Sequence, residues 1–221
     1  LPLMIGIPLV GALVMMFSKN LPARTAKLIA LVFSLVPLGL TVPLWIAHRN
    51  SLPMLAAGWT ANPPTATPPG SLSLFSSTFS VDGIPAFGVR FSLGVDGISL
   101  TMIALIAVLM PIVLGASWEE RLPAGRTIGG YFALLLVLQG AMVGVFAATN
   151  VFVFYVMFEV MLVPMYFIIG RFGGARRQYA AVKFFLYSFL GGLIMLGSVI
   201  GIYVASGTRL GAAPFDWAEL Q

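Results

Sequence analysis

The chain has 221 residues, of which 59% are hydrophobic and only 9% are charged, whereas a typical soluble domain has about 25% charged residues. This composition excludes a soluble globular fold, because too few polar side chains remain for a hydrated shell, and it predicts an integral membrane protein in a lipid bilayer. The net charge of +5 is scattered, which argues against nucleic acid as a partner.

Six apolar segments have the length and composition of membrane-spanning helices, which need about 20 residues. They cover roughly residues 1–17, 27–47, 97–117, 129–148, 151–170 and 181–205. Internal prolines such as Pro37 and Pro111 indicate kinks, because neighbouring helices and water satisfy the freed carbonyls in a bundle. The expected fold class is all-α, a polytopic transmembrane helical bundle with two N-terminal helices in 1–47 and four in 97–206.

The segment 48–96 separates the second and third spans. Its centre, TANPPTATPPGSLSLFSS, predicts an extended, Pro/Ser-rich external loop. The run FSVDGIPAFGVRFSLGVDGISL then alternates apolar and polar residues, which predicts a short hairpin. Residues 207–221 are expected to form another external loop. Because the chain opens at Leu1 inside an apolar run, we expect it to be an N-terminal fragment of a longer protein.

Several small motifs concern packing and helix ends. Asp96 with Ser99 is typical of an N-terminal cap for the third span. Two glycine pairs spaced four apart indicate close helix packing in lipid; they are Gly140 with Gly144 and Gly197 with Gly201.

Redox cofactors are not expected in this chain. It has no cysteine and one histidine, His48. Neither an iron–sulfur cluster nor a disulfide can form without cysteine, and a bis-histidine haem site lacks its second ligand. We therefore expect neither a cofactor nor a metal site, and interpret His48 as a solvated residue at the membrane interface.

The segment FYVMFEVMLVPMYFIIG has one charged residue, Glu159, near the middle of a span. An ionised carboxylate at that depth costs about 2.5–3.5 kcal/mol, which protonation, a cationic partner or water can offset. Tyr155 and Tyr166 fall on the same helical stripe as Glu159, and Pro164 frees a carbonyl that can hold a water. We interpret Glu159 as a proton carrier supported by these neighbours; the alternative is a structural Glu hydrogen-bonded between helices.

Lys183 is the second candidate for proton translocation. It lies near the start of the sixth span, in QYAAVKFFLYSF, between Tyr179 and Tyr187. An inward-turned amine would lie on a polar path towards Glu159, whereas an outward-turned amine would snorkel to the lipid headgroups. Gln139, in the middle of the fourth span, could bridge such a path by hydrogen bonds or form a packing contact.

Three stretches resemble the antiporter-like, proton-pumping membrane subunits of respiratory complex I. They are FEVMLVPMYFIIG with the basic loop after it, YAAVKFFLYSFLGGLIML, and FSLGVDGISL before the third span. The resemblance covers about residues 91–206. It implies a fold of about fourteen helices with two inverted repeats, each containing a broken helix. This chain would hold the first six of those helices.

The resemblance also implies residue roles. Glu159 matches a fifth-helix glutamate that pairs with a lysine on the seventh helix, which would lie beyond Gln221. Lys183 matches a lysine at the start of the sixth helix. The implied function is that of the non-redox, proton-translocating membrane subunit of NADH–quinone oxidoreductase, in which buried charged residues couple quinone reduction to proton pumping.

The same resemblance implies partners and a location. Flavin, iron–sulfur clusters and quinone would be held by partner subunits, and the neighbours would be other membrane subunits of complex I in the inner (plasma) membrane of the cell. A subunit of a multi-subunit cation/proton antiporter or of a membrane-bound hydrogenase shares these motifs and stays open. A passive membrane scaffold is a third possibility.

The distribution of basic residues predicts the orientation. The loops around 18–26, 118–128 and 171–180 hold eight Lys and Arg residues, against three on the other side, so we expect these loops in the cytoplasm. Cysteines introduced at Ser71 and Ala175 should react with an impermeant thiol reagent from opposite sides of the membrane. Reaction of both from one side would contradict this topology.

Overall fold

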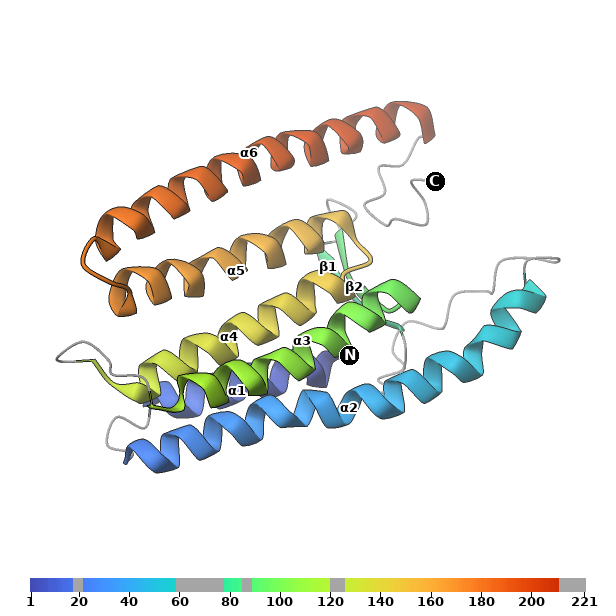
Figure 1. Ribbon diagram of the computed structural model, residues 1–221. Coiled ribbons are helices and arrows are strands. Elements are labelled where there is room, and N and C mark those ends of the chain that lie inside the picture. Colours follow the sequence, from blue (N-terminus) through green and yellow to red (C-terminus); the bar gives the residue numbers. More distant parts are fainter. Residues whose placement is uncertain (18–21, 59–77, 85–88, 120–125, 211–221) are drawn as a thin grey trace.

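The computed structural model describes residues 1–17, 22–58, 78–84, 89–119 and 126–210, through which six α-helices run (Figure 1). The helices are α1 (Pro2–Phe17), α2 (Ala23–Gly58), α3 (Gly97–Ala116), α4 (Ile128–Ala147), α5 (Val151–Phe172) and α6 (Arg177–Leu210). The strands β1 (Thr78–Ile84) and β2 (Val89–Gly94) and a short 3-10 helix, η2 (Ser117–Glu119), complete the described elements. The predicted helical fold class is confirmed.

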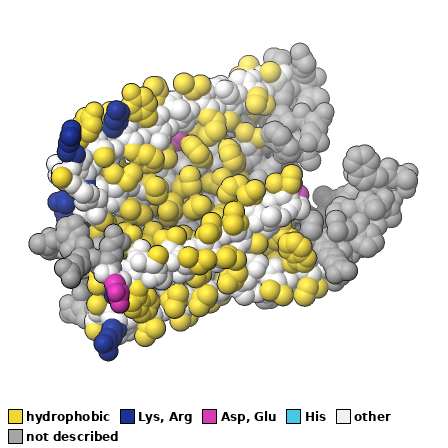
Figure 2. Space-filling model, in the orientation of Figure 1, with side chains coloured by type: hydrophobic (Ala, Val, Ile, Leu, Met, Phe, Trp, Pro, Cys, Tyr) yellow, Lys and Arg dark blue, Asp and Glu magenta, His cyan; other side chains and the backbone are white. Residues whose placement is uncertain are grey.

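The described helices have the length and polarity of a multi-pass membrane protein. Five are long and apolar enough to cross a bilayer, over Ala23–Ile46, Gly97–Glu119, Ile128–Ala147, Val151–Phe172 and Arg177–Ala205, and α1 is a shorter apolar helix. Hydrophobic side chains are spread along the helices over the face shown in Figure 2. Large apolar residues are therefore exposed where a soluble protein would carry charge, as expected of a surface that faces lipid or other membrane helices.

Two helices run past the ends expected from sequence. We expected the second helix to end at residue 47, but α2 continues to Gly58, and α6 reaches Leu210 rather than ending near 206. The polar residues after Ile46 end the apolar span without ending the helix. The Pro/Ser-rich stretch 59–77 and residues 211–221 lie outside the described residues.

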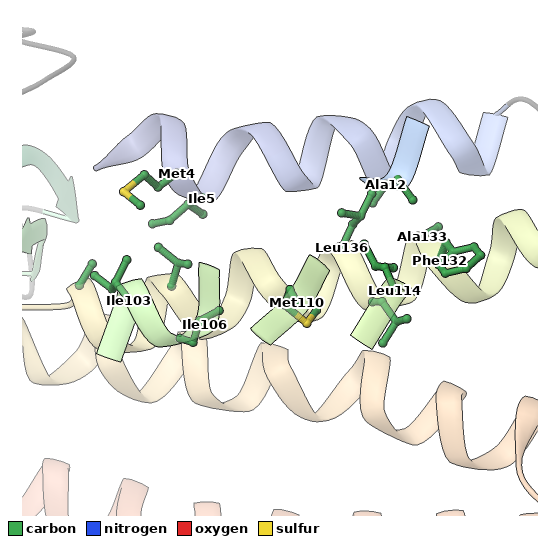
Figure 3. Packing of buried hydrophobic residues seen from close by; sticks show 14 of the residues in the cluster. Met4, Ile5, Ala12, Ile103, Ile106, Met110, Leu114, Phe132, Ala133 and Leu136 are labelled. Carbon is green, nitrogen blue, oxygen red and sulfur yellow. The ribbon is translucent and has the colours of Figure 1, made fainter. Parts of the chain in front are cut away.

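The core lies where α1, α3 and α4 meet. Met4 and Ile5 of α1 point towards α3 and α4, and Ala12 of α1 points towards Leu136 of α4 (Figure 3). The same cluster includes Ile103, Ile106, Met110 and Leu114 of α3 and Phe132 and Ala133 of α4. Helix α2 also packs on this group, α5 packs on α4, and α6 packs on α5 as the outermost layer (Figure 1). Helix α5 is therefore enclosed between two helices.

Glycines set how closely α4 approaches its neighbours. A Cβ at Gly140 would lie 3.0 Å from the backbone oxygen of Ile5 in α1, and one at Gly144 would lie 2.9 Å from the Sδ atom of Met157 in α5. The packing role expected for this pair is confirmed. The second pair, Gly197 and Gly201 in α6, has no atom within 4 Å of either Cβ position among the described residues.

The expected hairpin is present and is joined to the start of α5. Strands β1 and β2 are antiparallel, with an irregularity between Asp82 and Ile84. Leu93 of β2 bridges Ala148, and the Thr149 N–H donates to the backbone oxygen of Ser92 at 3.2 Å. The hairpin therefore braces the connection from α4 to α5.

Polar side chains cap the helices that follow. Asp96 accepts a hydrogen bond from the Ser99 N–H at 2.7 Å, and the Asp96 N–H donates to the Ser99 hydroxyl at 2.8 Å. This capping box confirms the role expected for Asp96. At the start of α5, the Asn150 side chain accepts from the N–H groups of Phe152 and Val153.

Described Lys and Arg side chains gather at one end of the bundle, on the left in Figure 2. The start of α2, the start of α4, the end of α5 and the start of α6 all lie at this end (Figure 1). Arg24, Lys27, Arg126, Arg171, Arg176 and Arg177 belong to these helix ends or lie beside them. The Lys27 amine also donates to the backbone oxygen of Trp118 and lies 5.4 Å from its ring centroid. Which side of the membrane this end faces stays a prediction.

The contact between α1 and α4 leaves no room for a side chain at Gly140. Gly140→Leu should therefore lower stability by about 1–3 kcal/mol through overpacking, seen as a lower melting temperature of the purified complex. Gly39→Leu is the control, because Gly39 is exposed on α2 with nothing within 4 Å of its Cβ position. Equal melting temperatures for the two variants would contradict the packing role.

Candidate functional site

Glu159 faces α6 because of how α5 is seated on α4. Met157 of α5 meets Gly144 of α4. Two residues further on, a helix has turned by about 200°, so Glu159 lies on the opposite side, towards α6. There its carboxylate lies against Gly192: an ideal Cβ at Gly192 would be 2.9 Å from the Glu159 Cδ atom.

The Glu159 carboxylate has an unsatisfied oxygen. Its Oε1 atom is buried and has no hydrogen-bond partner among the described residues. A structural glutamate would use such an oxygen to join two helices, because an unpaired buried acceptor costs free energy. This oxygen makes no such bond within the described chain. Chemically, the group can accept a water hydrogen bond or a proton.

Of the two tyrosines expected on the same stripe as Glu159, Tyr166 has a ring contact with α6. Tyr166 packs edge-on against Phe185 of α6, with ring centroids 5.5 Å apart and planes at 63°. Glu159 and Tyr166 therefore share the α6-facing side of α5. Tyr155, one turn before Glu159, is half-buried. Pro164 is buried within α5, and the helix continues past it to Phe172.

Lys183 lies on the other side of α6 from the Glu159 contact. It precedes Gly192 by nine residues, which corresponds to a half-turn offset and about 13 Å along the helix axis. Its side chain is exposed, and its amine lies 5.9 Å from the Tyr179 ring centroid and 6.0 Å from that of Tyr187. The structure therefore does not bring Lys183 and Glu159 together.

Gln139 is directed to α2 rather than to Glu159. Its side chain is fully buried, and its Nε2 atom donates to the backbone oxygen of Ser34 at 3.3 Å. The Gln139 Oε1 atom and the Ser34 hydroxyl have no hydrogen-bond partners within the described chain. This contact corresponds to the packing alternative. In the described ranges, no group of three or more His, Cys, Asp or Glu side chains gathers as a metal site would.

Residues 148–212 match the family model described as NADH:quinone oxidoreductase/Mrp antiporter, TM. This part of the chain belongs to that family. F(420)H(2) dehydrogenase subunit M of Methanosarcina mazei is 31% identical over 99% of the chain. NADH-quinone oxidoreductase subunit M of Escherichia coli K12 is 31% identical over 100% of it, and that of Mycobacterium tuberculosis is 41% identical over 62%.

The chain spans only part of these antiporter-family relatives. The alignments cover 39% of the Methanosarcina mazei protein, 41% of the Escherichia coli protein and 30% of the Mycobacterium tuberculosis protein. The activity of a whole subunit is therefore a matter for proposal.

Two solved structures contain a chain with a similar fold. A chain of respiratory complex I from Thermus thermophilus with bound NADH matches with a TM-score of 0.70 at 26% identity, over 99% of this chain and 38% of that chain. A chain of the membrane-bound sulfane sulfur reductase, an archaeal respiratory membrane complex, matches with a TM-score of 0.69 at 20% identity, over 97% and 29% of the two chains. The latter match shows the fold alone.

Sequence reasoning missed Gly192 as a site residue. Gly191 and Gly192 are adjacent in the sequence, yet Gly191 is exposed and Gly192 is buried. Only the placement of α5 against α6 distinguishes them. A helical wheel of α6 groups Gly192 with the buried Ala181 and Val199, which was the one available signal.

The contact between Gln139 and Ser34 predicts a small effect of substitution. Gln139→Leu loses one hydrogen bond but also removes an unpaired buried oxygen, so stability should change by less than about 1.5 kcal/mol. The melting temperature of the purified complex, compared with that of Gln139→Ala, measures this effect. The Ala variant should be less stable than the Leu variant because it leaves a cavity. A Leu variant that fails to assemble would contradict a packing role.

Proposed function

We propose that this chain is a proton-translocating membrane subunit of respiratory NADH–quinone oxidoreductase, in which quinone reduction elsewhere in the complex is coupled to proton movement through buried charged residues. The observation that carries this proposal is Glu159. It is the only acidic residue within the six described helices. It lies at the α5–α6 contact with one carboxylate oxygen buried and unpaired among the described residues. Acidic residues inside membrane helices commonly belong to proton or ion pathways.

The geometry favours a relay over a structural role. A relay group must exist in both protonation states, and its site must not hold one state by fixed hydrogen bonds. The unpaired oxygen of Glu159 meets the second condition. An approaching lysine favours the carboxylate and a withdrawing lysine favours the acid. The resemblance implies such a lysine on a seventh helix.

The proposal assigns no redox chemistry to this chain. Flavin, iron–sulfur clusters and quinone would be bound by partner subunits, and other membrane subunits of complex I would pack around the exposed apolar helix faces in the inner (plasma) membrane of the cell. The names of the relatives support this assignment, since several are subunits of NADH-quinone oxidoreductases. In this arrangement the chain is the non-redox part of a translocase.

A second candidate function is that of a subunit in a multi-subunit cation/proton antiporter or a membrane-bound hydrogenase. The matched family model is described by both the oxidoreductase and the Mrp antiporter. Glu159 would serve as the proton carrier in either assembly. Co-purification with flavin and iron–sulfur subunits would favour the oxidoreductase.

Replacement of Glu159 tests the relay directly. Glu159→Gln keeps the shape of the side chain but cannot ionise, so the complex should assemble while proton pumping and coupled quinone reduction fall by about 100-fold. Proton uptake by membrane vesicles measures pumping, and a blue-native gel measures assembly. Glu159→Asp should retain part of the activity because it keeps the charge on a shorter arm.

Lys183→Ala is the matched control, because it removes a charge from the far face of α6 and should have a smaller effect. Normal pumping by Glu159→Gln would rule out the relay. Loss of assembly in that variant would favour the structural alternative.

A further inference from the structure

Gly192 differs from the other described glycines in what occupies the space of its missing side chain. An ideal Cβ there would lie 2.9 Å from Cδ and 3.6 Å from Oε2 of Glu159, and closer still to Oε1. At the other crowded glycines of the described helices, the nearest atoms belong to apolar side chains, to a hydroxyl or to the backbone. Only at Gly192 does a carboxylate fill the space.

We propose that Gly192 is a positioning residue, whose missing side chain forms the notch in α6 that seats the Glu159 carboxylate between α5 and α6. Its consequence for proton transfer rests on the proposed function of Glu159. The seating itself rests only on the contact between these two residues. The notch is the space at Gly192 that the Glu159 carboxylate occupies.

The notch fixes the position of the Glu159 carboxyl group but gives it no hydrogen-bond donor. Each N–H in the interior of α6 is already used by the helix, so the backbone beside Gly192 has no donor to offer. The Glu159 Oε1 atom is accordingly buried there without a partner among the described residues. Its hydrogen-bonding capacity stays available for a proton or a water molecule, as a proton carrier requires.

A methyl group at position 192 should displace the acid rather than separate the helices. The crowded atoms are the far end of a flexible side chain, whereas α5 and α6 also meet through Tyr166 with Phe185 and through Gly170 with Ala181. Rotation of the Glu159 side chain is therefore the easiest relief of the overlap. The helix contact would survive, but the carboxylate would leave the notch.

The neighbouring glycine provides a matched control. Gly191 is exposed and has nothing within 4 Å of its Cβ position among the described residues. An alanine there makes the same chemical change, one residue away on the same helix, without touching Glu159.

The first experiment compares Gly192→Ala with Gly191→Ala in the assembled complex in membrane vesicles. Displacement of a reacting group by about 1 Å costs up to about 100-fold in rate, so we expect pumping to fall at least about tenfold in Gly192→Ala. Gly191→Ala should pump normally. Both variants should assemble on a blue-native gel.

A second readout is independent of pumping. A lipophilic carbodiimide reacts with protonated carboxyl groups, and mass spectrometry of the peptide that contains Glu159 follows its modification. The reaction should be several-fold faster in Gly192→Ala, because Oε1 leaves its buried place, and unchanged in Gly191→Ala. If pumping and labelling are the same in the two variants, the proposed role of Gly192 is wrong, whatever the pumping rate of Glu159→Gln.

Altered labelling in Gly192→Ala together with normal pumping in Glu159→Gln would support the notch but rule out Glu159 as a proton relay. The two proposals can therefore fail separately.

Shortening the acid provides a rescue. Aspartate at position 159 is one methylene shorter, so it should clear the added methyl group. In the Glu159→Asp background, Gly192→Ala should therefore cause little further loss of pumping. If Gly192→Ala alone fails to assemble, recovery of assembly in the double variant would still assign the overlap to the carboxylate. An unassembled double variant would overturn the proposal.

Discussion

Within a bilayer, every backbone N–H and C=O group must be paired inside its own helix or against a neighbour, because hydrocarbon offers no water. Side chains meet this requirement at the helix starts: Asp96 and Ser99 at α3, Thr127 at α4 and Asn150 at α5. Glu159 lies nine residues after Asn150, or about 13 Å along the helix, which is close to half of a hydrocarbon core of about 30 Å.

Glycines on both neighbouring helices fix the orientation of α5 about its own axis. Gly144 of α4 receives Met157, and Gly192 of α6 receives Glu159. These two side chains leave α5 about 200° apart, so each contact opposes a rotation that would release the other. The direction of the Glu159 carboxylate therefore depends on the packing of α4, α5 and α6 together. Small residues in membrane bundles usually bring backbones together, whereas Gly192 makes room for a carboxyl group.

Much of the helical fold was predictable because hydrophobic periodicity and length are local properties. The six helices, the hairpin and the cap at Asp96 depend on residues close in sequence. The ends of α2 and α6 were not predictable in the same way, since polarity marks the end of the span while the backbone stays helical through Gly58 and Leu210. Glu159 stood out because a charge in an apolar run is a local anomaly.

The relations between site residues could not be predicted, because a helical wheel describes one helix and not its neighbours. The wheel placed Glu159 and Tyr166 on one stripe, but it could not say that the stripe faces α6. It also left Lys183 free to turn towards Glu159, whereas α6 presents that lysine on its far side. Gln139 likewise has its partner on α2, far away in sequence.

The described bundle has three buried side-chain oxygens without partners, and their chemistry separates them. The Ser34 hydroxyl and the Gln139 amide are neutral at any physiological pH, and the Gln139–Ser34 bond already ties their helices together. Neither group changes its charge, so an unpaired atom there costs stability without adding an ionisable group. A carboxyl group differs, because one proton turns an anionic acceptor into a neutral donor. Of the three, only Glu159 can alternate between two states in place, and only Glu159 lies against a glycine that leaves it room.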